Sequence, residues 1–344
     1  MPRYDPHRDG AFAELDVLVV DDMGMPVPAV DVCVSFAMGP ADGIDRNGVT
    51  DKCGRFSTSC RTTGSIWILA QKDGYYQSRL HMDAQQVPYD KAIQTRRWSD
   101  APEETPIILK KIRSPAELHV HRGNCKGMAW PATNTLLGFD LELFDWCPPY
   151  GSGKHDDLQL EYDFWRSTTN WFQVYSHLTM TMTNCVDGFY LAPIDDFSEM
   201  KRCYHADSNA IYQQQIEFVY DRKSGEVERC QRMPKDQYMV FRTRTKTNDV
   251  GEVTSAHYGL IFEKGKYGLT WNIRAAFNPQ PNDTNLECTE NMGSDGRRSG
   301  ACSQSKGQTP RNNCITDRKL GLHVWQGFGE RDESCPVRQR RMDT

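Results

Sequence analysis

The chain has 344 residues, of which 38% are hydrophobic, 10% aromatic and 25% charged. This composition is typical of a globular protein that buries real cores, and it excludes intrinsic disorder. The formal net charge of -5 argues against nucleic acid as a partner, and the lack of any run of about 18 apolar residues predicts no membrane span.

The first part of the chain reads as short strands separated by turn residues. Residues 30–36 alternate between apolar and polar, which places the apolar side chains from Val30 to Phe36 on one buried face. Strands are predicted at 14–20, 30–36, 49–56, 66–70 and 105–112, whereas residues 81–105 are polar and irregular. Short strands at this spacing predict a β-sandwich.

Three motifs occur in order along these strands. They are V-V-D-D-x-G-x-P-V-x-A-V-x-V from Val19, G-V-T-D-x-x-G-R-F from Gly48 and A-x-K-D-G-Y-Y from Ala70. With these motifs, residues 13–112 resemble the carboxypeptidase-regulatory-like, transthyretin-like family. The resemblance implies that domain 1–114 is a Greek-key β-sandwich without catalytic residues of its own, a module common in secreted and cell-surface bacterial proteins.

A second, larger β-sandwich-like domain is predicted for residues 115–290, because a single core seldom grows past about 250 residues and helical periodicity is scarce. Its predicted strands are 137–144, 158–165, 171–182, 211–220, 238–247, 257–263 and 267–276. This region resembles the second half of uncharacterised bacterial secreted proteins, a likeness that implies no activity. The fold class is therefore all-β.

Twelve cysteines are scattered singly along the chain, with no C-x-x-C pair. This spacing argues against zinc or iron–sulfur clusters and favours disulfides formed in an oxidising compartment. Disulfides of Cys302, Cys314 and Cys335 are expected to pin an irregular tail, residues 291–344, which holds one brief strand at 322–325. We expect a secreted, periplasmic or cell-surface protein whose signal peptide was removed; the alternative is a cytoplasmic protein with reduced thiols.

Aromatic side chains of the second domain are the candidate ligand-binding residues. The candidates are Trp146, Tyr150, Tyr162, Trp165 and Trp171. Exposed indoles on a β-sheet face can bind sugar rings, whereas the same residues form core when buried, and the core interpretation is favoured. Alternation places Tyr162 and Phe164 on one face of a strand and Trp165 on the other.

His119 and His121 are the weak candidates for a metal site, since alternation places both rings on one side of a strand. The order Pro-x-x-x-His-x-His loosely resembles intradiol ring-cleavage dioxygenases, which also use a transthyretin-like sandwich. That family needs a tyrosine ligand before the Thr-Asp-x-x-Gly turn, and residues 23–50 contain no tyrosine. The dioxygenase interpretation is therefore disfavoured, and His119 and His121 are expected to be surface residues.

Acidic loops are the second candidate for a cation site. Asp156 and Asp157 end a glycine-rich loop whose oxygens suit calcium, although solvated turns are the simpler interpretation. We therefore expect no cofactor, with calcium as the alternative.

Sequence motifs for classical hydrolase or nucleotide chemistry are absent. The sequence favours a secreted or cell-surface, non-enzymatic binding or structural protein, with carbohydrate or a cell-surface protein as partner. One alternative is a subunit of a polymeric surface appendage, a homo-oligomer joined through strand edges. The other is a metal-dependent enzyme with a site near His119 and His121.

Overall fold

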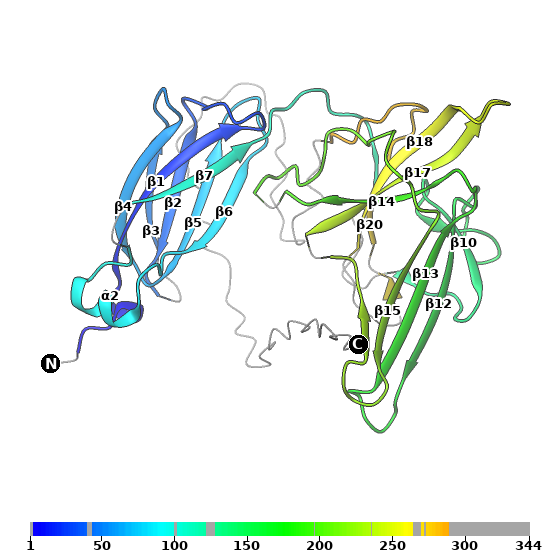
Figure 1. Cartoon of the computed structure of the whole chain (residues 1–344), viewed down its shortest axis with the longest axis horizontal. Helices are drawn as coiled ribbons and strands as arrows, with labels where there is room; N and C mark the ends of the chain where they lie inside the picture. Colours follow the sequence, from blue (N-terminus) through cyan, green and yellow to red (C-terminus); the bar gives the residue numbers. More distant parts are fainter. Residues whose placement is uncertain are drawn as a thin grey trace, which may run out of the picture. The chain divides into compact units, whose positions relative to one another are not determined.

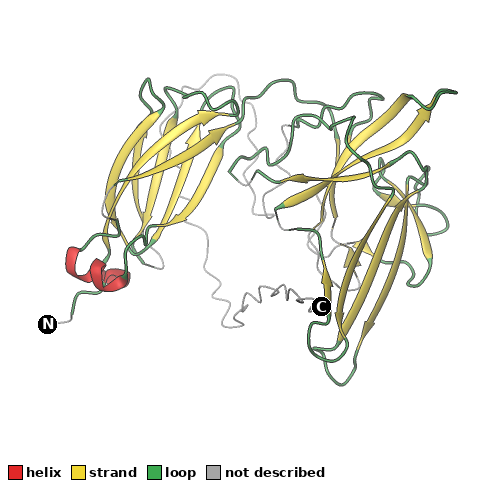
Figure 2. Cartoon of the chain, in the orientation of Figure 1, coloured by secondary structure: helices red, strands yellow, loops and turns green. Residues whose placement is uncertain are grey.

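The computed structural model describes residues 3–288 except 40–42, 100–101, 122–127, 196, 235, 264–269 and 272. Nearly every element is a strand, so the all-β prediction is confirmed (Figures 1 and 2). All of the described residues belong to one compact unit. The predicted strand 322–325 and the tail cysteines lie outside the described residues. Within the described part of the chain, no helix is long and apolar enough to cross a membrane.

Two sheets build the N-terminal sandwich. The strands are β1 (Ala11–Asp21), β2 (Asp31–Ala37), β3 (Gly43–Val49), β4 (Arg55–Thr62), β5 (Ser65–Gln71), β6 (Ser78–Asp83) and β7 (Glu103–Leu109), with short helices α1 (Pro6–Asp9) and α2 (Tyr89–Thr95). One sheet has the order β4-β1-β7 and the other the order β3-β2-β5-β6. Strands β1 and β7 run parallel, and the other pairs are antiparallel.

The core of this sandwich follows the alternation in the sequence. Val32, Val34 and Phe36 of β2 are at most 2% exposed and pack in one cluster with Val17 of β1 and Ile68 of β5. The buried face predicted for residues 30–36 is therefore confirmed. The outer face of the four-stranded sheet carries the alternate side chains and stays open to solvent.

A second pair of sheets forms the larger sandwich. Its strands are β8 (His119–His121), β9 (Met128–Ala129), β10 (Leu136–Asp140), β11 (Asp145–Trp146), β12 (Leu158–Arg166), β13 (Val174–Met182), β14 (Gly188–Pro193), β15 (Gln215–Arg222), β16 (Arg229–Gln231), β17 (Gln237–Thr247), β18 (Val253–Glu263), β19 (Thr270–Trp271) and β20 (Ile273–Phe277). The six-stranded sheet has the order β11-β10-β12-β13-β15-β16 and the five-stranded sheet the order β14-β17-β18-β20-β8. β19 and β9 form a small separate pair.

The two large sheets differ in how many faces they bury. One cluster joins Leu160 and Met180 of the six-stranded sheet to Phe241 and Phe277 of the five-stranded sheet. A second cluster, which includes Tyr238, covers the other face of the five-stranded sheet. Strand β17 is therefore buried on both sides, whereas one face of the six-stranded sheet is partly open to solvent.

Buried polar contacts tie the second sandwich to the segment after β7. Nζ of Lys110 donates to the backbone carbonyls of Met200 and Arg202 at 3.0 and 2.9 Å. The carboxylate of Glu287, a residue that is 1% exposed, accepts from the Tyr76 hydroxyl at 3.0 Å and from the Ser114 amide at 2.7 Å. Each buried charge at this junction has hydrogen-bond partners, as a buried ionic group requires.

Several elements differ from the sequence predictions. Strand β3 (Gly43–Val49) begins six residues before the predicted strand 49–56, and residues 81–105, expected to be irregular, contain the end of β6 and all of α2. The predicted strand 137–144 ends at Asp140, where the chain turns. Strand β14 was not predicted at all.

Six cysteines of the described residues are free thiols, namely Cys53, Cys60, Cys147, Cys185, Cys203 and Cys230. The expected disulfides stay a prediction.

Candidate functional site

The six-stranded sheet presents its free face through the odd-numbered residues of β12 and β13. Even-numbered residues such as Leu160 and Met180 are buried, while their odd-numbered neighbours are half-exposed or exposed. Side chains alternate along a strand, so one register aligns all the outward residues in rows across the sheet. Figure 1 shows β12, β13 and β15 side by side.

Trp165 and Tyr175 lie directly opposite each other at the end of β12 and the start of β13. Trp165 is 45% exposed and Tyr175 is half-exposed. Asp221 of β15 continues the row, and Nζ of Lys223 lies 4.0 Å from the centre of the Tyr175 ring. The row therefore places aromatic surface beside a carboxylate and an ammonium group.

The loop between β12 and β13 adds two more exposed rings. Trp171 is 63% exposed and Phe172 is 45% exposed, with ring centres 3.8 Å apart. The loop is ordered by its own polar side chains: the amide of Asn170 donates to Ser167 Oγ, and the amide of Phe172 donates to Asn170 Oδ1, both at 3.1 Å. The guanidinium of Arg222 lies 5.3 Å from the Phe172 ring. We call Trp165 and Tyr175, which lie in register on the odd-numbered face, the outer aromatic face.

Polar rows adjoin the outer aromatic face along the sheet. Asp163 of β12 lies opposite His177 of β13. His177 Nε2 lies 3.6 Å from Glu217 Oε2 and 3.5 Å from Thr179 Oγ1. Hydrogen-bond donors and acceptors thus line the surface within two residues of the rings.

The five aromatic residues singled out by the sequence differ in burial and in their place in the fold. Trp146 and Tyr162 are at most 5% exposed; Tyr162 stacks on Trp130 with ring centres 4.4 Å apart, so both serve the core. Tyr150 is 46% exposed but belongs to the loop that leads into the start of β12. Trp165 lies near the other end of β12, and Trp171 lies in the loop that follows that strand.

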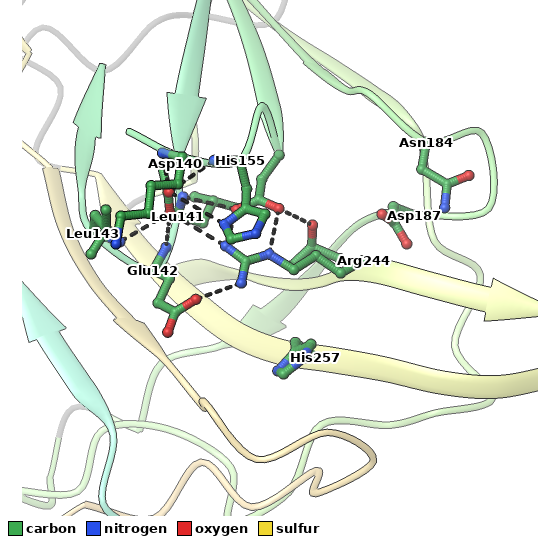
Figure 3. Close-up of polar contacts among 12 residues, drawn as sticks. Asp140, Leu141, Glu142, Leu143, His155, Asn184, Asp187, Arg244 and His257 are labelled. Atoms are coloured by element: carbon green, nitrogen blue, oxygen red, sulfur yellow. Dashed lines mark hydrogen bonds and ion pairs between the residues drawn. The ribbon is translucent and has the colours of Figure 1, made fainter. Parts of the chain in front are cut away.

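A second polar constellation surrounds Arg244 (Figure 3). Its guanidinium holds Asp157 in a bidentate ion pair, Nε–Oδ1 2.8 Å and Nη2–Oδ2 2.9 Å. It also reaches Asp140 Oδ1 at 3.3 Å and forms an ion pair with Glu142. Arg244 is on β17, whereas Asp140 ends β10, Glu142 follows it and Asp157 precedes β12, so this cluster ties the two large sheets together.

The carboxylates of this cluster are saturated with hydrogen bonds. Asp140, whose side chain is fully buried, accepts from four backbone amides at 2.8–3.0 Å. Burial raises the pKa of Asp140, but these amides outweigh burial and leave the pKa below its usual value. For Arg244, burial alone would lower the pKa. The hydrogen bonds to Asp157 and Glu142 outweigh burial, so the pKa of Arg244 is raised above its usual value. Both shifts favour the charged forms, the Asp140 carboxylate and the Arg244 guanidinium.

Backbone geometry positions Arg244. Its φ is +54°, and it lies where the pairing of β17 with β18 shifts register. The amide of the next residue, Thr245, donates to the buried carboxylate of Asp187 at 3.1 Å. Burial raises the pKa of Asp187. A positive φ in a residue with a side chain is uncommon, and here the bulge and its buried acceptor support it.

Histidines lie around this cluster without forming a metal site. His119 Nδ1 is 3.9 Å from Glu142 Oε1, and His155 Nδ1 is 3.6 Å from Asp140 Oδ2. His121 stacks instead on Phe144, with ring centres 5.2 Å apart, and burial lowers its pKa. Across the residues that the structure describes, no group of three or more histidine, cysteine or acidic side chains could hold a metal ion.

The two acidic candidates for a cation site, Asp156 and Asp157, have different hydrogen-bond partners. Asp157 is bound by Arg244 and by the hydroxyl of Thr243 at 3.3 Å. Asp156 is exposed and accepts from the Gln159 side chain at 3.3 Å. Neither carboxylate is arranged with the other around a shared cation.

The sequence did not single out Tyr175, Phe172, Asp163 or His177. Their signal was present in the alternation of residues 174–182, which assigns Tyr175 and His177 to the face opposite the buried methionines. Arg244 and Asp140 had no such signal, because their partners are about a hundred residues away along the chain.

The chain has little similarity to known proteins. No family model matches it, and no curated protein gives a significant match. Partly similar solved structures include 3-chlorocatechol 1,2-dioxygenase from Rhodococcus opacus 1CP, at 14% identity and TM-score 0.23, covering 32% of this chain and 64% of that chain. Catechol 1,2-dioxygenase from Acinetobacter sp. ADP1, inhibited by bound mercury, has 15% identity and a TM-score of 0.21, covering 30% of this chain and 53% of that chain. Catechol 1,2-dioxygenase from Pseudomonas arvilla C-1 has 12% identity and a TM-score of 0.23, covering 31% of this chain and 54% of that chain.

The chain thus spans between about half and two thirds of the length of these structures. TM-scores this low carry no argument about its chemistry.

Proposed function

We propose that this protein binds carbohydrate through the outer aromatic face and performs no chemistry on it. The observation that carries the proposal is the exposed Trp165 in register with Tyr175, next to the polar row of Asp163 and His177. A sugar ring has apolar C–H faces and a rim of hydroxyls. An aromatic surface stacks on the former while fixed polar groups bind the latter.

The charge pattern of the face favours an uncharged glycan. Asp163, Glu217 and Asp221 outnumber Lys223 on this face, so the face carries no excess of positive charge. A polyanion needs a continuous basic surface, and this face offers none. Neutral polysaccharides therefore fit better than sulfated ones.

A location outside the cytoplasm is part of the same proposal. Its support is the set of twelve scattered cysteines and the resemblance of residues 13–112 to a module of secreted proteins. Trapping thiols in protein from its native source, then comparing gels with and without reductant, tests this. Twelve trapped thiols would contradict it.

Affinity electrophoresis tests the binding itself. The panel is a mixed-linkage β-glucan, a galactomannan and amylopectin, with dextran sulfate as the anionic comparison. We expect retardation by at least one neutral polymer and about tenfold weaker binding by Trp165→Ala, the loss of roughly 1.4 kcal/mol of stacking. Phe12→Ala is the matched control, because Phe12 is 40% exposed on β1 of the other sandwich.

Two results would count against the proposal. One is wild-type protein that migrates unchanged with every neutral polymer. The other is binding that Trp165→Ala and Phe12→Ala lower equally, since the outer aromatic face would then not be the site.

A further inference from the structure

The N-terminal sandwich carries an aromatic residue on its own open face. Trp67 of β5 is 55% exposed. Its neighbours in register are Ser35 of β2 on one side and His81 of β6 on the other, and Asp45 of β3 continues the row beyond Ser35. One row thus crosses all four strands and combines a carboxylate, a hydroxyl, an indole and an imidazole.

Contacts within this row fix the polar groups around the indole. The ring centres of Trp67 and His81 are 4.1 Å apart with a 32° tilt, so the imidazole supports the indole. The hydroxyl of Ser35 donates to Asp45. Supported side chains lose less conformational entropy on binding, which favours recognition of a small rigid ligand.

The next row along the sheet supplies further polar groups. Asn47, Cys33, Leu69 and Arg79 are aligned across the same four strands. Asn47 and Arg79 are exposed, whereas Leu69 is half-buried. The exposed indole is therefore surrounded by an amide, a guanidinium, a carboxylate and an imidazole.

From this arrangement we infer that the outer face of the β3-β2-β5-β6 sheet is a second carbohydrate-binding platform, with Trp67 as its stacking surface and Asp45, Asn47, Arg79 and His81 as hydrogen-bonding groups. The inference rests on the proposed function for the class of ligand. It adds a site on a sandwich for which no binding role has been assigned.

The surface chemistry argues for a glycan over other occupants. Its apolar contributions are Trp67, half-buried Leu69 and, at the end of β3, exposed Val49, whereas a stable protein interface needs about 800 Å² per partner with an apolar centre. Asp45 and Arg79 alternate in sign, so the face offers no basic stripe for a polyanion. A neutral sugar ring needs one stacking surface and mixed donors and acceptors, which this face provides.

Titration calorimetry with a short oligosaccharide of the retained polymer tests the inference. The proteins are wild type, Trp67→Ala, Trp165→Ala, the double variant and Phe12→Ala. We expect two sites in wild type and Phe12→Ala, one in each single tryptophan variant, and none in the double variant. For the long polymer, Trp67→Ala should bind at least threefold more weakly.

Folding is checked by thermal melting, since Trp67 is exposed and its replacement should leave the melting temperature nearly unchanged. Should the alanine variant unfold, Trp67→Thr keeps a residue that favours β-strands and removes the ring. The same calorimetric criterion applies to it.

The outcomes separate the two ideas. If Trp67→Ala keeps wild-type stoichiometry and affinity while Trp165→Ala abolishes binding, the second platform is wrong and the proposed function stands. If Trp67→Ala abolishes binding and Trp165→Ala does not, the Trp67 platform stands and the outer aromatic face is not the site. Absence of any binding by wild type would overturn both.

Discussion

Replacing Arg244 by methionine tests how the larger sandwich is held together. Methionine keeps an unbranched apolar stem but removes the guanidinium. Asp140 and Asp157, whose side chains are 0% and 2% exposed, would then remain buried without a cation. Solvent cannot compensate at such depth, so the lost ion pairs should appear almost fully in the free energy of unfolding.

The expected magnitude follows from that burial. Breaking a buried ion pair by removing one partner costs about 3–5 kcal/mol. Each kcal/mol lowers the melting temperature of a domain of 150–250 residues by roughly 2–4 °C, which gives a fall of about 6–20 °C. Urea unfolding and thermal melting of the Arg244→Met protein measure both quantities.

Two comparisons isolate the buried charge. Arg8→Met removes an ion pair whose side chains are 56% and 36% exposed, and it should leave the free energy of unfolding nearly unchanged. Arg244→Lys keeps the charge and loses the planar fork, so its stability should fall between wild type and Arg244→Met. The deficit of Arg244→Met should also shrink as the pH falls, because the abandoned carboxylates can then be neutralised by protonation.

An Arg244→Met protein as stable as Arg8→Met at pH 7 would refute this reasoning. The cluster would then be no more than a surface ion-pair network.

Three further changes have defined outcomes. Gly54→Ala should lower the free energy of unfolding by well over 1 kcal/mol, because φ is +74° and a Cβ would lie 2.5 Å from a backbone carbonyl of β1; Gly24→Ala, at φ +78° in open space, should cost about 1 kcal/mol in the same urea titration. Burial, with nearby carboxylates, raises the pKa of the Cys147 thiol to about 11, so its alkylation at pH 8 should be at least tenfold slower than that of exposed Cys185, followed by mass spectrometry. The depressed pKa of Asp140 contributes stability above its unfolded pKa near ~4, and this is lost as the pH falls through the folded pKa; wild type should therefore lose stability below pH ~4 more steeply than Asp140→Asn.

Period-two alternation explains which strands the sequence predicted well. In β2 and β12 one face is buried and the other is open to solvent. Apolar and polar residues therefore alternate, and the strand can be predicted from the sequence. Strand β3 is an edge strand with mostly exposed residues, and its Gly-Ile-Asp-Arg-Asn-Gly sequence has no buried face to mark. The sequence of such an edge strand resembles that of a polar loop, and for this reason β3 was not predicted.

The polar cluster shows a different limit. Arg244 meets Asp140, Glu142 and Asp157 through contacts that span 87 to 104 residues. Local pattern contains no information about such distant pairing, and Arg244 itself sits in an alternating strand as an ordinary polar residue. Predicting the Arg244 cluster therefore requires knowledge of the sheet topology. The exposure of the aromatic candidates on strands, in contrast, follows from alternation along each strand.

Strand phase also explains why the five aromatic candidates divided as they did. Tyr162 and Trp165 are three residues apart on β12, so they point to opposite faces, and only the odd-numbered one meets solvent. The same rule sets Trp67 apart from its neighbours Ile66 and Ile68, which are at most 1% exposed. Large aromatic residues on the solvent side of a two-layer sandwich contribute little to its core, so Trp67 and Trp165 leave their rings open to contact. We propose that a ligand stacks on both rings, and the Trp67 and Trp165 variants test the two sites separately.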